Sequence, residues 1–473
     1  MRSAPMVVAL AAALFAATTA PKVVAQTATA RDPDQPSLHA IADAVRAEQL
    51  HATIATLVNF GTRHTLSDTK SEKHGICAAR RWVKSRFEAI SKDCGGCLEI
   101  VTPSQVFTGE RVPKPTEVMD VVAIQRGQDQ RGNSDPQRVV VITGHLDSRV
   151  TDIMNSSSDA PGANDDASGV AAVLEAARVL SKQRYPATIV YGVLSGEEQG
   201  LYGGKVIAAY ARAQGWQVEA DLNNDIIGNT HGGDGVVDNS TVRVFAEGSK
   251  AVETPKQADR RRYNGGEVDS PSRNLARFMA GLSDRYLDNL HVRMVYRTDR
   301  FGRGGDQVEF LNAGYPAVRV TEAHENYTRQ HQDVRIEKGV HYGDSIDGVD
   351  FDYLAQVTRL NAVTLAALAS APMPPSNVSV EGAVSADTTV KWNAAPGAVG
   401  YRVWWRDTTA PQWQHSVLVP GGATTQGVLH KVVIDDWFFG VASISADGFE
   451  SPVVFPGDAG AFVSAPPEKN ATQ

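Results

Sequence analysis

The sequence predicts an α/β fold in which a mixed, mostly parallel sheet is flanked by helices, with a small all-β sandwich at the C-terminus. Between residues 138 and 320, β-branched apolar runs alternate with stretches of helical spacing, as in sheets that helices cover on both faces. A proline-rich stretch at residues 371–375 ends this alternation. The short strand patterns beyond it carry Trp392, Tyr401 and Trp404, an arrangement typical of a small sandwich.

The N-terminal residues have the features of a signal peptide. Arg2 supplies a positive charge, residues 6–17 form an apolar run, and small residues precede Gln26. The apolar run is too short to span a bilayer, which disfavours the alternative of an uncleaved membrane anchor. We therefore expect residues 1–25 to be removed, and the mature protein to be secreted or periplasmic and not transmembrane.

The larger unit is expected to begin with a helical region at residues 36–86, where apolar residues recur at helical spacing. Strands and helices then alternate. In order, they are a strand at 138–143, a helix at 167–180, a strand at 187–194, a helix at 200–212, a strand at 217–227, a helix at 270–287, a strand at 317–320 and a helix at 352–369. Because such sheets bind ligands where their strands end, the residues just after each strand are the candidates for chemistry.

The composition bears on the partners of the chain. Hydrophobic residues make up 42% of the 473 residues and charged residues 21%, which is typical of globular domains. The 54 acidic residues outnumber the 46 basic ones, which gives a net charge of -8. A mildly acidic chain has no basic field to hold nucleic acid, so we expect no nucleic-acid partner.

The chain has three cysteines, Cys77, Cys94 and Cys97. A structural zinc site would need a second cysteine pair, which the sequence lacks. A local disulfide within the Cys94–Cys97 pair is the interpretation we favour for an oxidising compartment. The sequence alone leaves the pairing open.

The first two polar motifs follow the strand at 138–143 and precede the helix at 167–180. His145 can offer one ring nitrogen to a metal ion, and Asp147, two residues on, faces the same way and can accept from the other nitrogen. Asp165 lies in the loop that runs into the helix, where a carboxylate can bridge two cations.

Three further motifs follow later strands. Glu197 and Glu198 can divide their roles, one binding metal while the other acts as a base towards the substrate. Asp225 ends the next strand, and His331 lies in a polar loop after the last one. A single acidic pair or histidine is usually a solvated or structural feature. The ordered set near successive strand ends instead indicates one assembled metal site.

These ordered motifs resemble those of the two-zinc aminopeptidase family that includes the secreted bacterial leucyl aminopeptidases. The similarity runs from about residue 145 to 333, and more weakly back to about residue 52. The resemblance implies the zinc exopeptidase fold and two Zn²⁺ ions as cofactors. Its implied ligands are His145 and Asp225 for one zinc, Glu198 and His331 for the other, and Asp165 as the bridge.

The resemblance also implies the catalytic residues and the substrate. Glu197 is expected to be the general base, with Asp147 supporting His145. The ligand set agrees with this assignment, because nitrogen and oxygen ligands without thiolate suit catalytic zinc. The implied function is a secreted zinc-dependent aminopeptidase that acts on peptides with free N-termini.

The sequence departs from the family pattern near the last ligand. The sequence His331-Gln332-Asp333 stands where the family often has a longer run, so His324 is a rival ligand. Gln307 stands where the family usually has a histidine, which puts substrate contacts at residues 301–307 in doubt. Arg303 is either a transition-state contact or, as we favour, a solvated surface arginine.

Other functions remain as alternatives. A carboxypeptidase on the same fold would need a basic residue for the terminal carboxylate of its substrate, which the sequence does not exclude. A glutaminyl cyclase of this fold resembles a single-zinc site and does not need the first histidine, so the presence of His145 disfavours it. An inactive binding protein would typically have lost ligands or the base, and this chain keeps them.

The expected domains are a signal peptide at 1–25, a zinc peptidase catalytic domain at 26–370 and a β-sandwich at 371–473. The sandwich resembles a fibronectin type III module in its strands around Trp392 and Tyr401. Its sequence leaves open whether it contacts a polymer or cell surface or packs on the enzyme.

Overall fold

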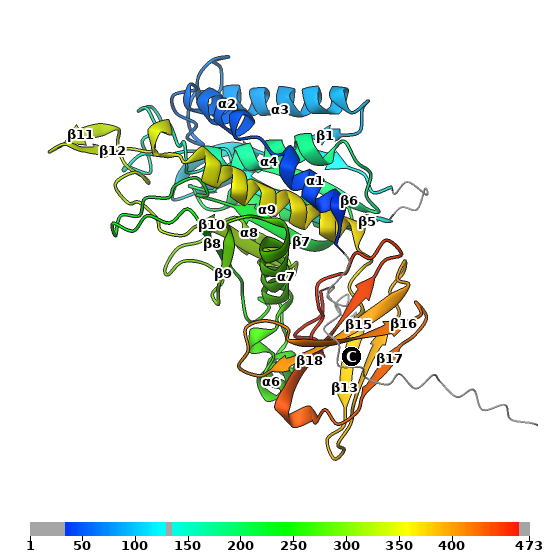
Figure 1. The fold of residues 1–473 in the computed structure, drawn as a ribbon. Coiled ribbons are helices and arrows are strands. Elements are labelled where there is room, and N and C mark those ends of the chain that lie inside the picture. The colour runs from blue at the N-terminus through cyan, green and yellow to red at the C-terminus, as the bar shows by residue number, and fades with distance from the viewer. Residues whose placement is uncertain (1–33, 129–134, 463–473) are drawn as a thin grey trace, which may run out of the picture.

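The structure is a computed structural model, and it describes residues 34–128 and 135–462. The expected signal peptide at residues 1–25 lies outside the described residues. The described chain forms a layered α/β unit, from which the C-terminal strands extend as a separate lobe (Figure 1).

A mixed sheet forms the centre of the larger unit. Neighbouring strands are parallel at β6–β5, β5–β7, β7–β10 and β8–β9 and antiparallel at β1–β4, β4–β6 and β10–β8. Within the described ranges the sheet has eight strands, in the order β1 (Glu99–Val101), β4 (Val121–Gln125), β6 (Ala187–Leu194), β5 (Asp135–His145), β7 (Gln217–Asn224), β10 (Ala317–Glu322), β8 (Thr241–Phe245) and β9 (His291–Val295).

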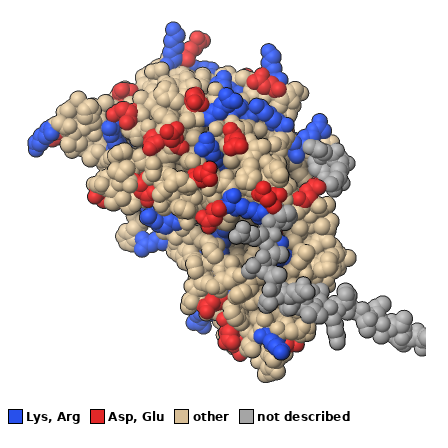
Figure 2. Space-filling model, viewed as in Figure 1, with Lys and Arg blue, Asp and Glu red and all other residues tan. Residues whose placement is uncertain are grey.

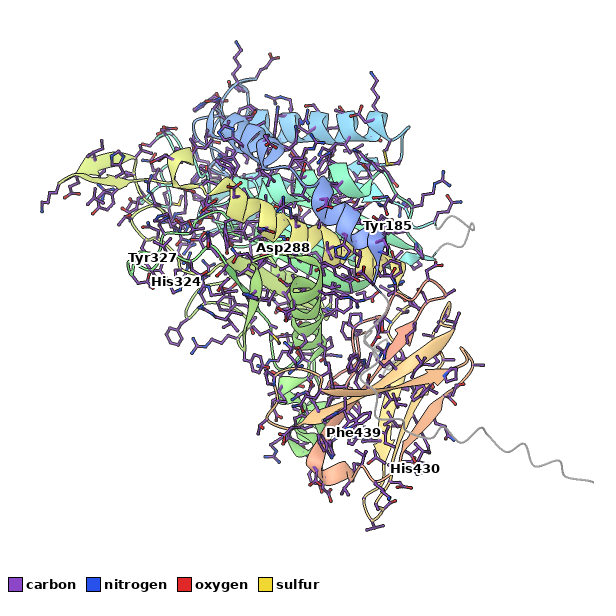
Figure 3. All side chains as sticks on the ribbon, viewed as in Figure 1. Tyr185, Asp288, His324, Tyr327, His430 and Phe439 are labelled. Atoms are coloured by element: carbon purple, nitrogen blue, oxygen red, sulfur yellow. A yellow bond between two sulfur atoms is a disulfide. The ribbon has the colours of Figure 1, made fainter. Side chains whose placement is uncertain are left out.

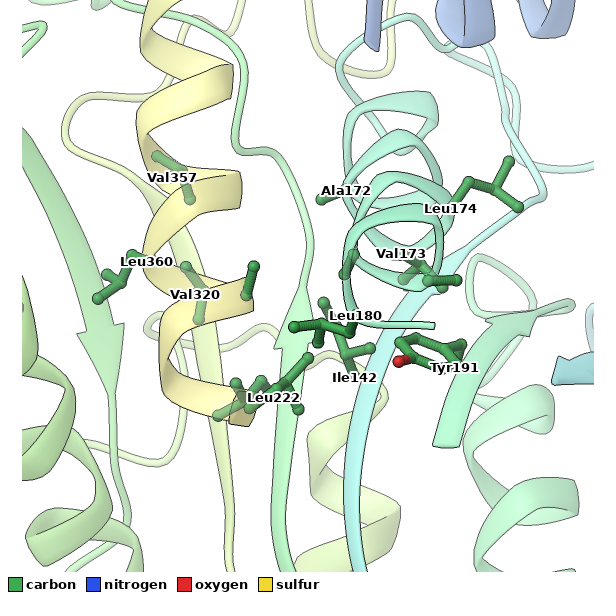
Figure 4. Close-up of a cluster of buried hydrophobic side chains, with 14 of the residues drawn as sticks. Ile142, Ala172, Val173, Leu174, Leu180, Tyr191, Leu222, Val320, Val357 and Leu360 are labelled. Carbon is green, nitrogen blue, oxygen red and sulfur yellow. The ribbon is translucent and has the colours of Figure 1, made fainter. Parts of the chain in front are cut away.

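Helices cover both faces of this sheet. One face packs against α1 (Pro36–Ala44), α2 (Ala47–Val58), α3 (Gly75–Asp93), α4 (Ala167–Leu180), α7 (Pro271–Tyr286) and α9 (Phe351–Ser370). The other face packs against α5 (Tyr202–Ala213) and α8 (Gln307–Asn312). The first core brings Ile142 and Leu222 of the central strands against α4 and α9 (Figure 4). The predicted mixed, mostly parallel sheet flanked by helices is confirmed.

Smaller elements lie at the margins of the larger unit. The hairpin of β11 and β12 projects from the body, away from the C-terminal lobe (Figure 1). The hairpin of β2 and β3 precedes β4. These marginal elements are β2 (Ser104–Gly109), β3 (Val112–Met119), α6 (Pro255–Asn264), β11 (Arg335–Glu337) and β12 (Val340–Tyr342), with the short 3-10 helices Gly266–Val268 and Ile346–Gly348.

The prediction that residues 36–86 form one continuous helical region is wrong. The chain leaves the helical path between α2 and α3, at residues 59–74. Gly61 has φ +74°, and a Cβ there would lie 2.5 Å from the ring of His74. The tight turn at this glycine ends the helical region early, because a left-handed residue cannot continue a right-handed helix.

The C-terminal lobe consists of two small antiparallel sheets, which confirms the all-β part of the fold class. One sheet has the order β13 (Ser376–Glu381), β14 (Thr388–Asn393) and β17 (Gln426–Leu429), and the other has the order β16 (His415–Pro420), β15 (Gly400–Asp407) and β18 (Trp437–Ile444). The 3-10 helix Ile434–Asp436 precedes β18. Trp392, Tyr401 and Phe439 belong to a core of their own between these sheets.

A buried ion-pair cluster joins this lobe to the larger unit. Asp269, just before α7, accepts from Arg277 of α7 at 2.9 Å and from Arg406 of β15 at 2.7 Å. All three side chains are buried. Removing one partner of a buried pair leaves an uncompensated charge, which costs more than the pair itself contributes.

We therefore expect Asp269→Ala to lower the free energy of unfolding by about 3–5 kcal/mol, as measured by urea denaturation. Asp259→Ala is the matched control, since Asp259 makes an exposed pair with Arg262 on α6, and such pairs contribute less than about 1 kcal/mol. Equal effects of the two substitutions would show that the cluster does not stabilise the contact between the lobes.

The remaining features concern disulfides, membranes and surface charge. Cys94 and Cys97 form a disulfide and Cys77 is free. Among residues 34–128 and 135–462, no helix combines the length and apolar character that a membrane span requires. On the face seen in Figure 2, Lys and Arg side chains are interspersed with Asp and Glu side chains.

Candidate metal centre

The first group of candidate ligands forms where neighbouring parallel strands end. His145 is the last residue of β5, and Asp225 directly follows β7, the strand beside it. Nε2 of His145 lies 3.8 Å from Oδ1 of Asp225 and 3.2 Å from Oδ1 of Asp165. Because parallel strands end at the same edge, strand pairing alone brings the first two residues together.

The second group shares Asp165 with the first. Nε2 of His331 lies 2.9 Å from Oδ2 of Asp165 and 3.1 Å from Oε1 of Glu198. In each group the candidate ligand atoms lie within 4.8 Å of one another. The two oxygens of Asp165 therefore face different groups, an arrangement that would let one carboxylate serve both.

The chemistry of these residues fits two zinc ions. Each group supplies one imidazole and two carboxylates and no thiolate, which suits zinc with a position left for water. Among the described residues, Nε2 of His145 and Oε1 of Glu198 are buried without a hydrogen bond of good geometry. Buried polar atoms normally have partners, so atoms left in this way fit ligands that face a cation.

The charges of the groups also fit cations. Burial lowers the pKa of His331, but Glu198 and Asp165 outweigh burial and raise it to about 10. Burial likewise opposes ionisation of Asp165, yet His331 and His145 hold its pKa well below the usual value. The raised pKa values of His331 and His145 show that the surrounding carboxylates favour a positive charge at both positions, which zinc would supply, because a histidine ligand binds metal in its neutral form.

Asp147 contacts both His145 and the backbone of the paired glutamates. Nδ1 of His145 lies 3.0 Å from the backbone oxygen of Asp147 and 3.7 Å from its carboxylate. The carboxylate also accepts from the backbone N–H groups of Glu197 and Glu198, at 3.2 and 3.1 Å, and from Thr65 at 3.1 Å. Asp147 therefore holds the histidine through its backbone and the two glutamates through its side chain.

Glu197 lies in the wall of a cavity of about 390 Å³, together with Asp165, Glu198, Asp225 and His331. It belongs to neither ligand group. Burial raises the pKa of Glu197 well above its usual value, and the neighbouring carboxylates add to this. A carboxyl group with a raised pKa that faces the cavity suits proton transfer.

Three supporting residues were not singled out from the sequence. Asp166 caps α4 and accepts from the backbone of Gly169 and of His145, at 2.9 Å each, so that one carboxylate ties α4 to the end of β5. Asp344 accepts from the N–H of Asp165 at 2.7 Å. The third, the buried Arg63, donates to backbone oxygens of Leu146 and Gly162, in the loops that carry Asp147 and Asp165.

Backbone strain gathers around the candidate ligands. Ile226, just after Asp225, has φ 62°, and His331 has φ 55°. Leu201, in the cavity wall, has φ 57°. Residues with side chains adopt this left-handed region rarely, and a β-branched isoleucine is a marked exception. Such strain persists where the surrounding contacts fix the position of a functional side chain.

The loop before α8 contributes to the cavity wall. Arg303 is exposed, as expected of a surface arginine, but it also lines the cavity and donates to Glu325 at 2.8 Å. Gln307 is buried and donates to Asp299 at 2.6 Å. The rival ligand His324 lies 2.7 Å from Asp234 and belongs to neither ligand group. It lies beside Tyr327, far from the C-terminal lobe (Figure 3).

Metal removal should destabilise the protein. Any ion that binds only the folded chain stabilises it by RT ln(1 + [L]/Kd), which is about 4 kcal/mol at a thousandfold excess over Kd. We therefore expect dialysis against a chelator to lower the melting temperature by several degrees, and added Zn²⁺ to restore it. Added Mg²⁺ is the control, because magnesium prefers all-oxygen sites. An unchanged melting temperature would contradict a metal site here.

Comparison with known proteins agrees with this chemistry. The family model described as "Peptidase family M28" matches residues 120–340. A probable zinc metalloprotease of Pyrenophora teres f. teres (strain 0-1) is 43% identical over 434 residues, which cover 90% of this chain and 87% of that protein. A probable zinc metalloprotease of Pyricularia oryzae is 42% identical over 443 residues, covering 92% of this chain and 86% of that protein.

Solved structures share the fold. The Legionella pneumophila LapA aminopeptidase matches with a TM-score of 0.50 at 19% identity, over 74% of this chain and 78% of that chain. LapB from Legionella pneumophila matches with a TM-score of 0.51 at 20% identity, over 72% of this chain and 77% of that chain. From the full-length similarity to the curated relatives, together with the family match, it follows that this chain belongs to peptidase family M28 and is a zinc metalloprotease.

Proposed function

We propose that this metalloprotease is an aminopeptidase that uses two zinc ions and removes N-terminal residues from peptides. The observation that carries the proposal is the pair of ligand groups that share Asp165, beside Glu197 in one cavity. The LapA aminopeptidase, which shares the fold, supports the choice of reaction. The expected ligands are His145, Asp165, Glu198, Asp225 and His331.

The residues of the chain divide the chemical work. The five candidate ligands would hold two zinc ions, which would supply a Lewis acid for the scissile carbonyl and lower the pKa of the attacking water. Glu197 accepts the proton of that water and returns it to the leaving amine. Asp147 fixes the backbone of Glu197 and Glu198, so the base and its neighbouring ligand keep their positions.

A carboxypeptidase is the second candidate, and a specific feature favours it. Four arginines line the cavity, and an arginine can hold the terminal carboxylate of a substrate in a bidentate pair. The fold and the metal groups suit both reactions, so the choice depends on which end of the peptide is bound.

The test is a panel of aminoacyl p-nitroanilides, the same compounds after N-acetylation, and N-acylated dipeptides with a free C-terminus. We expect chelator-sensitive cleavage of the free-amine compounds alone. Cleavage of the N-acylated dipeptides in their place would establish a carboxypeptidase. Absence of all cleavage in protein that holds two zinc ions would contradict both.

The same proposal covers location and domains. We propose a secreted enzyme, because a disulfide such as Cys94–Cys97 persists in oxidising compartments. We further propose that the catalytic domain ends near Ser370, where α9 ends, and that the following strands are a fibronectin type III-like module.

A further inference from the structure

Arginine side chains from three separate segments meet in the cavity wall. Arg111 comes from the turn between β2 and β3, Arg149 from the loop after β5, and Arg300 and Arg303 from the loop between β9 and α8. Among the described residues that line the cavity, Leu201 is the one large apolar side chain. A pocket for leucine-like side chains would be lined mostly by apolar groups.

These arginines differ in whether their positive charge is already paired with a carboxylate of the chain. Arg300 and Arg303 share Glu325, at 3.3 and 2.8 Å, and Arg300 also contacts Asp299 at 3.0 Å. In the described chain, Arg111 donates to the backbone oxygen of Glu198 at 3.2 Å and has no carboxylate within ion-pair distance. The guanidinium of Arg111 is therefore free to pair with a substrate.

Arg149 is held in place with one end directed at the site. Its Nε and Nη2 donate to the backbone oxygens of Val150 and Thr151, at 3.1 and 3.0 Å. Its Nη1 lies 4.0 Å from Glu198, at the limit of an ion pair. Since a guanidinium has five N–H donors, Arg149 keeps donors for a further acceptor.

The remaining cavity wall carries four carboxylates, from Asp165, Glu197, Glu198 and Asp225. Two divalent cations would balance these charges. Because Arg300 and Arg303 already pair with Glu325, the guanidinium groups of Arg111 and Arg149 remain as the excess charge. A guanidinium pairs with a carboxylate in a planar, bidentate arrangement, which is stronger and more selective than a neutral hydrogen bond.

We infer that the cavity selects substrates that carry a carboxylate next to the scissile bond. The carboxylate comes either from an acidic side chain on the first residue or from the free C-terminus of a dipeptide. This inference rests on the proposed aminopeptidase function, and it gives the arginines that line the cavity the role of a specificity pocket.

The experiment compares kcat/KM over two arms. One arm uses glutamyl, aspartyl and leucyl p-nitroanilides, in which the side chain is the only source of a carboxylate. The other uses Leu-Leu with a free C-terminus and Leu-Leu amide. In one of the two arms, we expect kcat/KM to be at least tenfold higher for the substrate that carries the carboxylate than for the matched substrate that lacks it. We expect Arg111→Gln and Arg149→Gln each to reduce that preference about 10–100-fold, as loss of a charged hydrogen bond does.

The control is Arg262→Gln, because Arg262 is exposed on α6, and it should leave both arms unchanged. Active enzyme without a carboxylate preference in either arm would overturn the inference and leave the proposed function standing. If the enzyme cleaved none of the free-amine substrates, that result would instead count against the proposed function.

A binding measurement decides the inference independently of turnover. Glutamic acid α-amide and leucinamide are titrated into zinc-loaded Glu197→Ala protein by calorimetry. Tighter binding of the acidic amide by tenfold or more, lost in Glu197→Ala/Arg111→Gln, supports the pocket. Equal binding of the two amides overturns it.

Discussion

Glu197→Ala is expected to lower kcat by about 10²–10⁴-fold while the protein keeps its fold and both zinc ions. The reason is that Glu197 belongs to neither ligand group but lies in the same cavity wall. Its substitution removes proton transfer and leaves the metal ligands in place. Steady-state assays on the preferred p-nitroanilide give kcat. Elemental analysis gives the zinc content.

Glu197→Gln separates charge from size, since it keeps the shape of the side chain and removes its basicity. It should lose as much activity as Glu197→Ala. Glu88→Ala is the control, because Glu88 makes an exposed pair with Lys84 on α3. Activity of Glu197→Ala within tenfold of the unmodified enzyme would exclude Glu197 as the base.

The fold was predictable because the central elements carry strong periodic patterns. Strand β6 and helix α4 have the predicted bounds, Ala187–Leu194 and Ala167–Leu180. Short edge strands such as β1 and β9 have too few residues to show a periodic pattern of apolar residues. They become strands because they pair with a neighbouring strand of the sheet. At Gly61 the chain passes so close to the ring of His74 that a Cβ would not fit, and no local pattern reveals this approach.

The candidate ligands were predictable for a related reason. His145 is the last residue of β5 and Asp225 directly follows β7, so finding the strands also located these two candidates. Arg111 and Arg303 lie in loops that meet only in the folded chain, and an arginine in a loop is usually solvated. The backbone contact between Asp147 and His145 was equally hidden, because sequence indicates which groups are near and not which atoms meet.

Asp165→Ala is expected to lose most of the bound zinc and all measurable activity. Asp165 is the one described residue shared by both ligand groups, so its removal takes a ligand from each ion at once. It also leaves His145 and His331 without the carboxylate that lies 3.2 and 2.9 Å from them. Elemental analysis after gel filtration should give well below one zinc per chain.

Glu198→Ala is the matched comparison, because Glu198 belongs to one group only. It should keep close to one zinc per chain, held by His145, Asp165 and Asp225. Asp165→Asn adds a conservative variant, which keeps the size of the side chain and removes the charge that two cations would share. If Asp165→Ala retained two zinc ions, or lost no more than Glu198→Ala does, the bridging role would belong to another residue. The graded loss, from two ions to one and then to almost none, is what a carboxylate shared between two sites requires.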